Sequence, residues 1–233
     1  MRSSIRIKYI GRYILVAQKP RIKQVRICSC VGIFKLLLMT TRSDKLTAII
    51  LAGGKSSRMG EDKALISIQG VPLLQMIYQI AESCAATVYV VTPWEERYQH
   101  ILPPNCQFIK EAPLSAGPLV GFAQGLAQVQ TDWVLLLACD LPNLRVEVLQ
   151  AWANQLDDVA PEAIAALAHH IKGWEPLCGF YRRSCLADLN KYIEQGGRSF
   201  QQWLNQHSVQ VLPVTEPGML FNCNTPEDLA NLN

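Results

Sequence analysis

A glycine-rich segment with closely spaced cations is the part of the sequence that most directly indicates chemistry. Gly53 and Gly54 end a short apolar run, and Lys55, Arg58 and Lys63 follow them. Glycines allow a backbone to approach a phosphate closely and to present N–H donors to it. Cationic side chains can then neutralise the remaining phosphate oxygens. The segment therefore predicts a loop that binds a triphosphate.

Two common phosphate-binding motifs do not describe this segment. Gly54-Lys55-Ser56 mimics the end of a P-loop, but P-loop spacing requires a glycine at position 49, where Ile49 stands. The motif GxGxxG separates its first two glycines, whereas Gly53 and Gly54 are adjacent. The alternative without chemistry is an ordinary strand-to-helix turn with solvated basic residues. The complete segment 51–64 favours phosphate binding over that alternative.

A carboxylate follows the most apolar strand predicted in the chain. Asp140 stands directly after the run 133–138 and is followed by Leu141-Pro142. In an open α/β sheet, ligands bind beyond the carboxyl ends of the strands. Mg²⁺ prefers oxygen ligands and shares its coordination sphere with phosphates. We therefore predict that Asp140 binds Mg²⁺, the alternative being a capping role before the next helix.

Alternating strand-like and helix-like segments from Leu46 onward must position these residues. Continuous apolar strands with intervening amphipathic helices predict a three-layer α/β/α sandwich with a mostly parallel central sheet. The segment 175–181 is expected to run in a different direction. The predicted strands are 47–52, 87–92, 106–109, 133–138, 163–168, 175–181 and 209–214, and the predicted helices are 72–83, 119–130, 145–156, 184–195, 199–205 and one starting at 225–228.

Charge is unevenly distributed along the 233 residues. The chain carries 22 Lys and Arg and 19 Asp and Glu, but residues 1–38 hold nine of the basic residues and no acidic one. The remainder, with 13 basic and 19 acidic groups, has a formal charge of −6, which disfavours binding to nucleic acid. We predict a basic N-terminal extension over 1–44, outside a functional domain over 45–233. A targeting segment and a folded functional role are the alternatives for the extension.

The eight cysteines show no CxxC pair and no regular framework. Several lie in apolar runs, as buried free thiols do, which favours a reducing cytoplasm as the location. The sequence also contains no run of roughly 20 apolar residues, the length needed to span a bilayer. We therefore expect a cytoplasmic protein without membrane contact.

The segments around Gly53 and Asp140 together resemble the nucleotidyltransferases whose first strand ends in LAGGxSSRMGxDK, and among them the molybdenum cofactor guanylyltransferase family. Further agreement with that family comes from 117–121 (GPLVG), 138–142 (ACDLP), 197–199 (GRS) and 222–229 (NCNTPEDL). The resemblance extends from about 46 to 232 and implies a Rossmann-like nucleotidyltransferase fold. Residues 1–45 have no counterpart in it.

The resemblance also implies a nucleotide site. Backbone groups of the first strand's end would contact the nucleotide, Lys63 would bind phosphates, and Asp140 would bind both nucleotide and Mg²⁺. The family's Asp before the GPLxG segment has Glu111 as its equivalent here, with a longer side chain. The expected nucleotide-binding residues are Leu51, Ala52, Gly53, Gly54, Lys63, Glu111 and Asp140.

The implied reaction transfers GMP from GTP to the terminal phosphate of the molybdenum-molybdopterin cofactor and releases pyrophosphate. An anionic phosphate oxygen attacks, so catalysis depends on positioning and charge neutralisation rather than on a side-chain nucleophile. Asp140 is assigned to the metal, Lys63 to the reacting phosphates and Arg58 to the departing pyrophosphate. Arg198 is a candidate contact to the acceptor's phosphate. Transient contact with molybdoenzymes or their chaperones would follow.

Other functions remain open from the sequence alone. The same fold could transfer a cytidylyl group to molybdopterin or act on a sugar phosphate. A non-catalytic carrier that binds nucleotide and delivers cofactor is a third alternative, against which the presence of both Lys63 and Asp140 argues.

Overall fold

The computed structural model describes residues 6–10, 13–18, 21–26, 46–53, 62–112, 117–214, 216, 218–223 and 228. The chain divides into two compact units, residues 1–42 and 43–233. The first unit contains a three-stranded antiparallel sheet that the sequence analysis did not predict. Its strands, in spatial order, are β1 (Arg6–Ile10), β2 (Tyr13–Gln18) and β3 (Arg21–Arg26).

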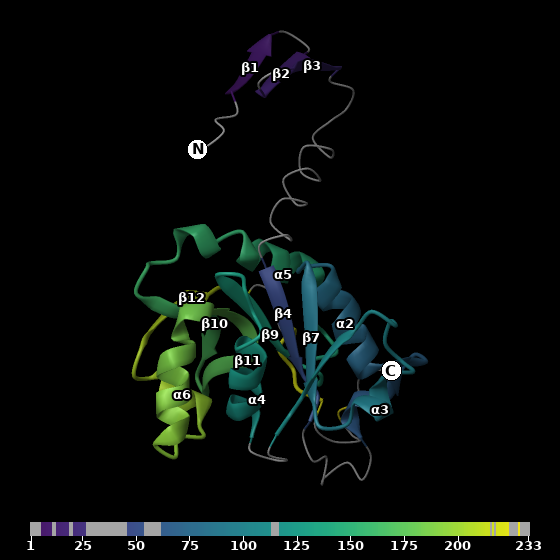
Figure 1. The fold of residues 1–233 in the computed structure, drawn as a ribbon, viewed down its shortest axis with the longest axis vertical. Coiled ribbons are helices and arrows are strands. Elements are labelled where there is room, and N and C mark those ends of the chain that lie inside the picture. Colours follow the sequence, from purple (N-terminus) through teal and green to yellow (C-terminus); the bar gives the residue numbers. More distant parts are fainter. Residues whose placement is uncertain are drawn as a thin grey trace. The chain divides into compact units, whose positions relative to one another are not determined.

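A seven-stranded sheet forms the centre of the second unit (Figure 1). One strand, β11, pairs antiparallel with both of its neighbours, and the remaining pairings in the sheet are parallel. The mostly parallel sheet and the reversed strand are therefore confirmed. In spatial order the strands are β12 (Ser208–Leu212), β10 (Ala163–His170), β11 (Gly173–Arg182), β9 (Trp133–Ala138), β4 (Leu46–Leu51), β7 (Thr87–Thr92) and β8 (Gln107–Lys110).

Helices cover both faces of this sheet, which confirms the three-layer architecture (Figure 1). One face packs against α2 (Leu73–Glu82) and α5 (Val146–Ala153), and the other against α4 (Pro118–Leu126), α6 (Leu186–Glu194) and α7 (Phe200–Leu204). The shorter elements are η1 (Lys63–Leu65), β5 (Ser67–Ile68), β6 (Val71–Pro72), α3 (Glu95–Tyr98), η2 (Leu156–Asp158) and η3 (Arg183–Cys185).

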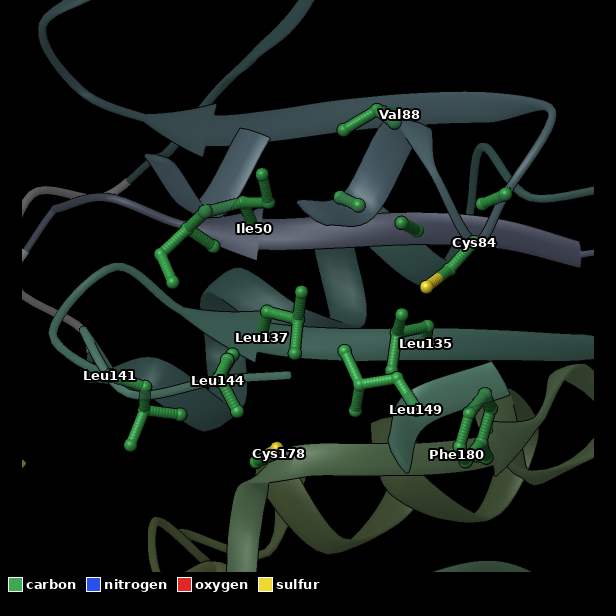
Figure 2. Close-up of a cluster of buried hydrophobic side chains, with 14 of the residues drawn as sticks. Ile50, Cys84, Val88, Leu135, Leu137, Leu141, Leu144, Leu149, Cys178 and Phe180 are labelled. Carbon is green, nitrogen blue, oxygen red and sulfur yellow. The ribbon is translucent and has the colours of Figure 1, made fainter. Parts of the chain in front are cut away.

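The central strands bury both of their faces. Ile50 of β4 packs with Leu135 and Leu137 of β9 on the α5 side (Figure 2), whereas Ile49 and Leu136 face α4. All five side chains are fully buried. Burying one such side chain contributes about 1.5–3 kcal/mol. Because successive strand residues point to opposite faces, burial on both sides explains why these strands are continuously apolar.

Helix α2 shows how sequence spacing selects the buried face. Its apolar residues recur three and four positions apart, so they form one stripe along the helix. Pro72 precedes the first turn, where its missing N–H costs no helical hydrogen bond. The buried stripe consists of Leu73, Leu74, Ile77, Tyr78 and Ala81.

Several predicted ends shift by a few residues. Helix α4 ends at Leu126 rather than at Gln130, because tighter turns at Gln128 and Val129 close the helix.

The described cysteines are free thiols, as predicted. Among the helices of the described residues, none is long and apolar enough to cross a membrane. The predicted helix start at 225–228 falls almost entirely outside the described residues.

Candidate active site

The register of the central strands brings the predicted site residues to one edge of the sheet. Leu51, the last residue of β4, pairs with Ala138 of β9 on one side and with Val91 of β7 on the other. The segments that leave these strands therefore start at the same level. A cavity of about 370 Å³ opens between them. Its lining consists of Leu51, Ala52, Gly53, Asp62, Lys63, Ala64, Tyr98, Glu111, Gly117, Pro118, Gly121, Ala138, Cys139, Asp140 and Leu177.

Most of the predicted nucleotide-binding residues line this cavity. The structure brings together Leu51, Ala52, Gly53, Lys63, Glu111 and Asp140. Gly54 and Arg58, like Lys55, lie outside the described residues. Asp62 and Tyr98 also line the cavity, and the sequence analysis missed both.

The end of β4 is held so that its backbone borders the cavity. The Ala52 N–H donates to the Val91 carbonyl at 2.9 Å, which extends the β4–β7 ladder beyond the strand. A Cβ at Gly53 would overlap the Glu111 carboxylate and would lie 3.0 Å from Pro93 Cδ. A side chain at position 53 would therefore force the Glu111 carboxylate to move, a contact that no local motif reveals.

Glu111 presents a carboxylate to the cavity from the end of β8. It is 9% exposed, and its carboxyl carbon would lie 3.7 Å from a Cβ on Gly121 of α4. The backbone N–H of Glu111 donates to the Thr92 carbonyl at 3.0 Å. Burial raises the pKa of the Glu111 carboxyl above its ordinary value.

The segment that carries Glu111 is anchored to α4 by Gln124. The Gln124 Oε1 accepts from the Ala112 N–H at 3.1 Å, and its Nε2 donates to the Ala112 carbonyl. One side-chain amide thus satisfies both backbone groups of the residue after Glu111. Sequence reasoning missed Gln124, because Gln124 and Ala112 are 12 positions apart and belong to different elements.

Lys63 and Asp140 lie next to each other in the wall of the cavity. Lys63 Nζ lies 3.7 Å from Asp140 Oδ2, and the two side chains are 20% and 22% exposed. Burial raises the pKa of the Asp140 carboxyl, while the nearby Lys63 ammonium lowers it to a lesser extent. Among the described residues, Asp140 Oδ1 is buried and accepts no hydrogen bond.

The unpartnered oxygen of Asp140 fits a metal ligand. A buried acceptor without a partner costs about 1–3 kcal/mol, and a bound cation would remove that cost. Carboxylate oxygens are the donors that hard divalent cations prefer. The described part of the chain contains no group of three or more His, Cys, Asp or Glu side chains that could hold a metal ion.

The segment near the C-terminus lies against the loop that contains Asp140. The Cys223 N–H donates to the Asp140 carbonyl at 2.9 Å, and Asn143 Nδ2 donates to the Gly218 carbonyl at 3.3 Å. This contact places Cys223, part of the predicted motif 222–229, next to Asp140; residues 224–227 and 229 of that motif lie outside the described part.

Arg198 lies at the C-terminal end of α6. Its Nη1 donates to the carbonyls of Ile193 at 2.8 Å and of Gly197 at 2.6 Å. The Ile193 carbonyl belongs to the last turn of α6 and also accepts from the Gly196 N–H, and Gly197 lies beyond the helix. Arg198 is not among the residues that line the cavity.

Comparison with known proteins identifies the family. Residues 48–211 match the family described as the MobA-like NTP transferase domain. A probable molybdenum cofactor guanylyltransferase of Nostoc sp. is 70% identical over 187 residues, covering 80% of this chain and 90% of the relative. The molybdenum cofactor guanylyltransferase of Vibrio cholerae is 30% identical over 196 residues, covering 83% and 94%.

Solved structures share the fold. Molybdopterin-guanine dinucleotide biosynthesis protein A of Archaeoglobus fulgidus has a TM-score of 0.67 at 23% identity, covering 80% of this chain and 96% of that one. A nucleotidyl transferase from Methanothermobacter has a TM-score of 0.65 at 17% identity, covering 81% and 95%. The family match spans strands β7, β8 and β9, most of β4, and the cavity residues between them. The chain belongs to the family of MobA-like NTP transferases.

Proposed function

We propose that this chain transfers GMP from GTP to the terminal phosphate of the molybdenum-molybdopterin cofactor, which releases pyrophosphate and forms the guanine dinucleotide cofactor. The observation that carries the proposal is the cavity in which Lys63 faces Asp140, whose Oδ1 lacks a partner among the described residues. The 70% identity to a probable molybdenum cofactor guanylyltransferase supports GTP as the nucleotide.

The metal proposed for this site is Mg²⁺, with Asp140 as its protein ligand. A bound divalent cation would withdraw charge from the phosphate oxygens of the nucleotide. Asp140 supplies an ionised oxygen for it from a loop held in place by the Cys223 N–H. Its neighbour Lys63 supplies a positive charge on the same side of the cavity.

The reaction needs positioning and charge rather than a side-chain nucleophile. An acceptor phosphate oxygen forms a bond to the α-phosphorus of GTP, and the bond from that phosphorus to the bridging oxygen of the β-phosphate breaks. The bonding electrons leave with pyrophosphate. Lys63 neutralises charge on the reacting phosphates, and Arg58 is proposed to do so on the departing pyrophosphate. No proton has to be removed, because the attacking oxygen is already anionic.

The nucleotide is proposed to lie along the end of β4. The backbone of Leu51, Ala52 and Gly53 borders the cavity, and Glu111 provides an acceptor on the α4 side. Gly54, which lies outside the described residues, is proposed to contact the nucleotide as well. The close packing of Gly53 against Glu111 supports this arrangement, because it places backbone and carboxylate at one wall of the cavity.

The functional domain is proposed to comprise residues 45–233, with the basic extension 1–44 outside it. The family match over 48–211 supports this division. The free thiols among the described cysteines support a reducing cytoplasm as the location. The product would reach its destination through transient contacts with molybdoenzymes or their chaperones.

The test is pyrophosphate release by the full-length chain with each nucleoside triphosphate, with and without Mg²⁺ and the molybdenum-molybdopterin cofactor. We expect release with GTP only when metal and acceptor are both present. Release with CTP instead would identify a cytidylyltransferase, and release with a sugar phosphate as acceptor would identify a different transferase of this fold. Binding of GTP without release in any mixture would indicate a carrier.

A further inference from the structure

A second carboxylate lies next to the phosphate-binding lysine and has a different environment from Asp140. Asp62 directly precedes Lys63 and caps η1, the single turn that Lys63 begins. Its Oδ1 accepts from the Ala64 N–H at 3.2 Å, and its Oδ2 accepts from the Tyr98 hydroxyl at 2.8 Å. Each oxygen of Asp62 thus has a donor from the protein, whereas Asp140 Oδ1 has none among the described residues.

The donors to Asp62 Oδ2 come from α3, far away in the sequence. Tyr98 is 1% exposed, so its ring fixes the position of the hydroxyl in the core. Arg97 Nη1 lies 3.6 Å from the same oxygen, and the Arg97 guanidinium lies 4.4 Å from the centre of the Trp94 ring. Burial and the neighbouring Asp62 raise the pKa of Tyr98, so the hydroxyl keeps its proton at neutral pH.

The Asp62 cap helps to hold the turn that carries Lys63. A turn of three residues has little stability of its own, because few hydrogen bonds offset the entropy of ordering it. The turn is held on one side by buried Ala64 and on the other by the Asp62 side chain. If Asp62 rotated away, the Ala64 N–H would lose its partner, and the turn that carries Lys63 would be less constrained.

We propose that Asp62, anchored by Tyr98 and Arg97, is a positioning residue that aims Lys63 at the phosphates of the nucleotide. The proposal rests on the function proposed above, because it assigns Lys63 to phosphate binding. In this proposal Asp62 acts through Lys63 rather than on a metal, since each of its oxygens already accepts from a protein donor, the Ala64 N–H or the Tyr98 hydroxyl.

The test is a double-mutant cycle with Lys63→Ala, read out by pyrophosphate release and by calorimetric binding of GTP and of guanosine. Tyr98→Phe retains the buried ring and removes only the hydroxyl bond, and we expect about a 3- to 10-fold loss of turnover. Asp62→Ala removes the cap as well, and we expect about a 10- to 100-fold loss. In the Lys63→Ala background, neither substitution should lower turnover or GTP affinity further.

Guanosine separates positioning from general damage to the cavity. It lacks phosphates, so Asp62→Ala and Tyr98→Phe should weaken binding of GTP and leave binding of guanosine unchanged. Tyr78→Phe is the matched control, because Tyr78 is also a buried tyrosine, 3% exposed, but does not line the cavity. It should change neither GTP affinity nor turnover.

Three outcomes would overturn the proposal. The first is an equal loss from Asp62→Ala with and without Lys63, which would show that Asp62 acts independently. The second is a parallel loss of GTP and guanosine affinity. The third is a lower melting temperature for Tyr98→Phe with unchanged kcat, KM and GTP affinity. If the wild-type chain showed no turnover, only the proposed function would be rejected. The GTP and guanosine affinities of the variants would still decide the role of Asp62.

Discussion

Replacing Asp140 with asparagine should move activity and stability in opposite directions. Asp140→Asn keeps the size of the side chain and removes its charge. An ion pair between partly exposed groups contributes about 0–1 kcal/mol, which is what the contact of Asp140 with Lys63 would lose. A buried ionised oxygen without a partner costs about 1–3 kcal/mol, which the substitution would reduce. The second effect is larger, so the metal-free variant should be more stable by about 1 kcal/mol, or 2–4 °C in Tm.

The pH dependence provides a signature of this stabilisation. Burial raises the pKa of Asp140 in the folded chain above its ordinary value, so the folded state binds the proton more tightly than the unfolded state does. The favourable contribution of the protonated group is complete below about pH 4 and is lost as the pH rises through the raised pKa. The stability advantage of Asp140→Asn should therefore be small below about pH 4, grow as the pH rises through that window and then level off.

Turnover should fall by about 10²–10³-fold in the same variant, the scale of removing one preorganised electrostatic contact. The assays are urea unfolding of the metal-free protein across pH and pyrophosphate release with Mg²⁺, GTP and acceptor. Asp158→Asn is the matched control, because Asp158 is exposed and does not line the cavity. A loss of stability above about 2 kcal/mol would show that the Lys63–Asp140 pair supports the fold, and near-normal turnover would refute the metal assignment.

Three further substitutions test the walls of the cavity. Lys63→Ala should lower turnover by about 10²-fold, measured as pyrophosphate release. The stability of the nucleotide-free protein, measured by thermal unfolding, should change little. An unchanged turnover rate would exclude Lys63 from the phosphate site. Gly53→Ala should weaken GTP binding, because the alanine Cβ would overlap the Glu111 carboxylate. Adding Glu111→Asp, which shortens that side chain, should restore part of the GTP affinity measured by titration. Gln124→Ala should cost up to about 1 kcal/mol, because water can replace the two exposed hydrogen bonds to Ala112. Urea unfolding and a higher KM for GTP would reveal the loss.

Secondary structure was predictable where the pattern of apolar residues in the sequence matched the burial of those residues in the fold. Strands 87–92 and 133–138 were predicted at the ends where the structure has them. Their β-branched or continuously apolar residues suit positions that are buried on both sides of a sheet. Helix ends were less accurate, as in α4, because the last turn is decided by a few hydrogen bonds rather than by a periodic pattern.

The sequence alone indicated the chemistry of the site. Glycines followed by cations and a carboxylate after an apolar strand pointed to phosphate and metal, because residue type and strand-end position carry that information. This is why Lys63 and Asp140 were identified before their separation of 3.7 Å was known. The sheet of strands β1, β2 and β3 was missed, because that segment was interpreted by its charge rather than by its pattern of polar and apolar residues.

Only the tertiary structure revealed how the site is held. A Cβ at Gly53 would displace the carboxylate of Glu111, which follows a different strand. Asp62 is held by Tyr98, 36 positions away, and Ala112 by Gln124 on another element. Such contacts depend on strand register and helix packing, which join residues without any regular spacing. The sequence therefore determined which groups are available for the proposed reaction, and the fold determined which other residues contact them.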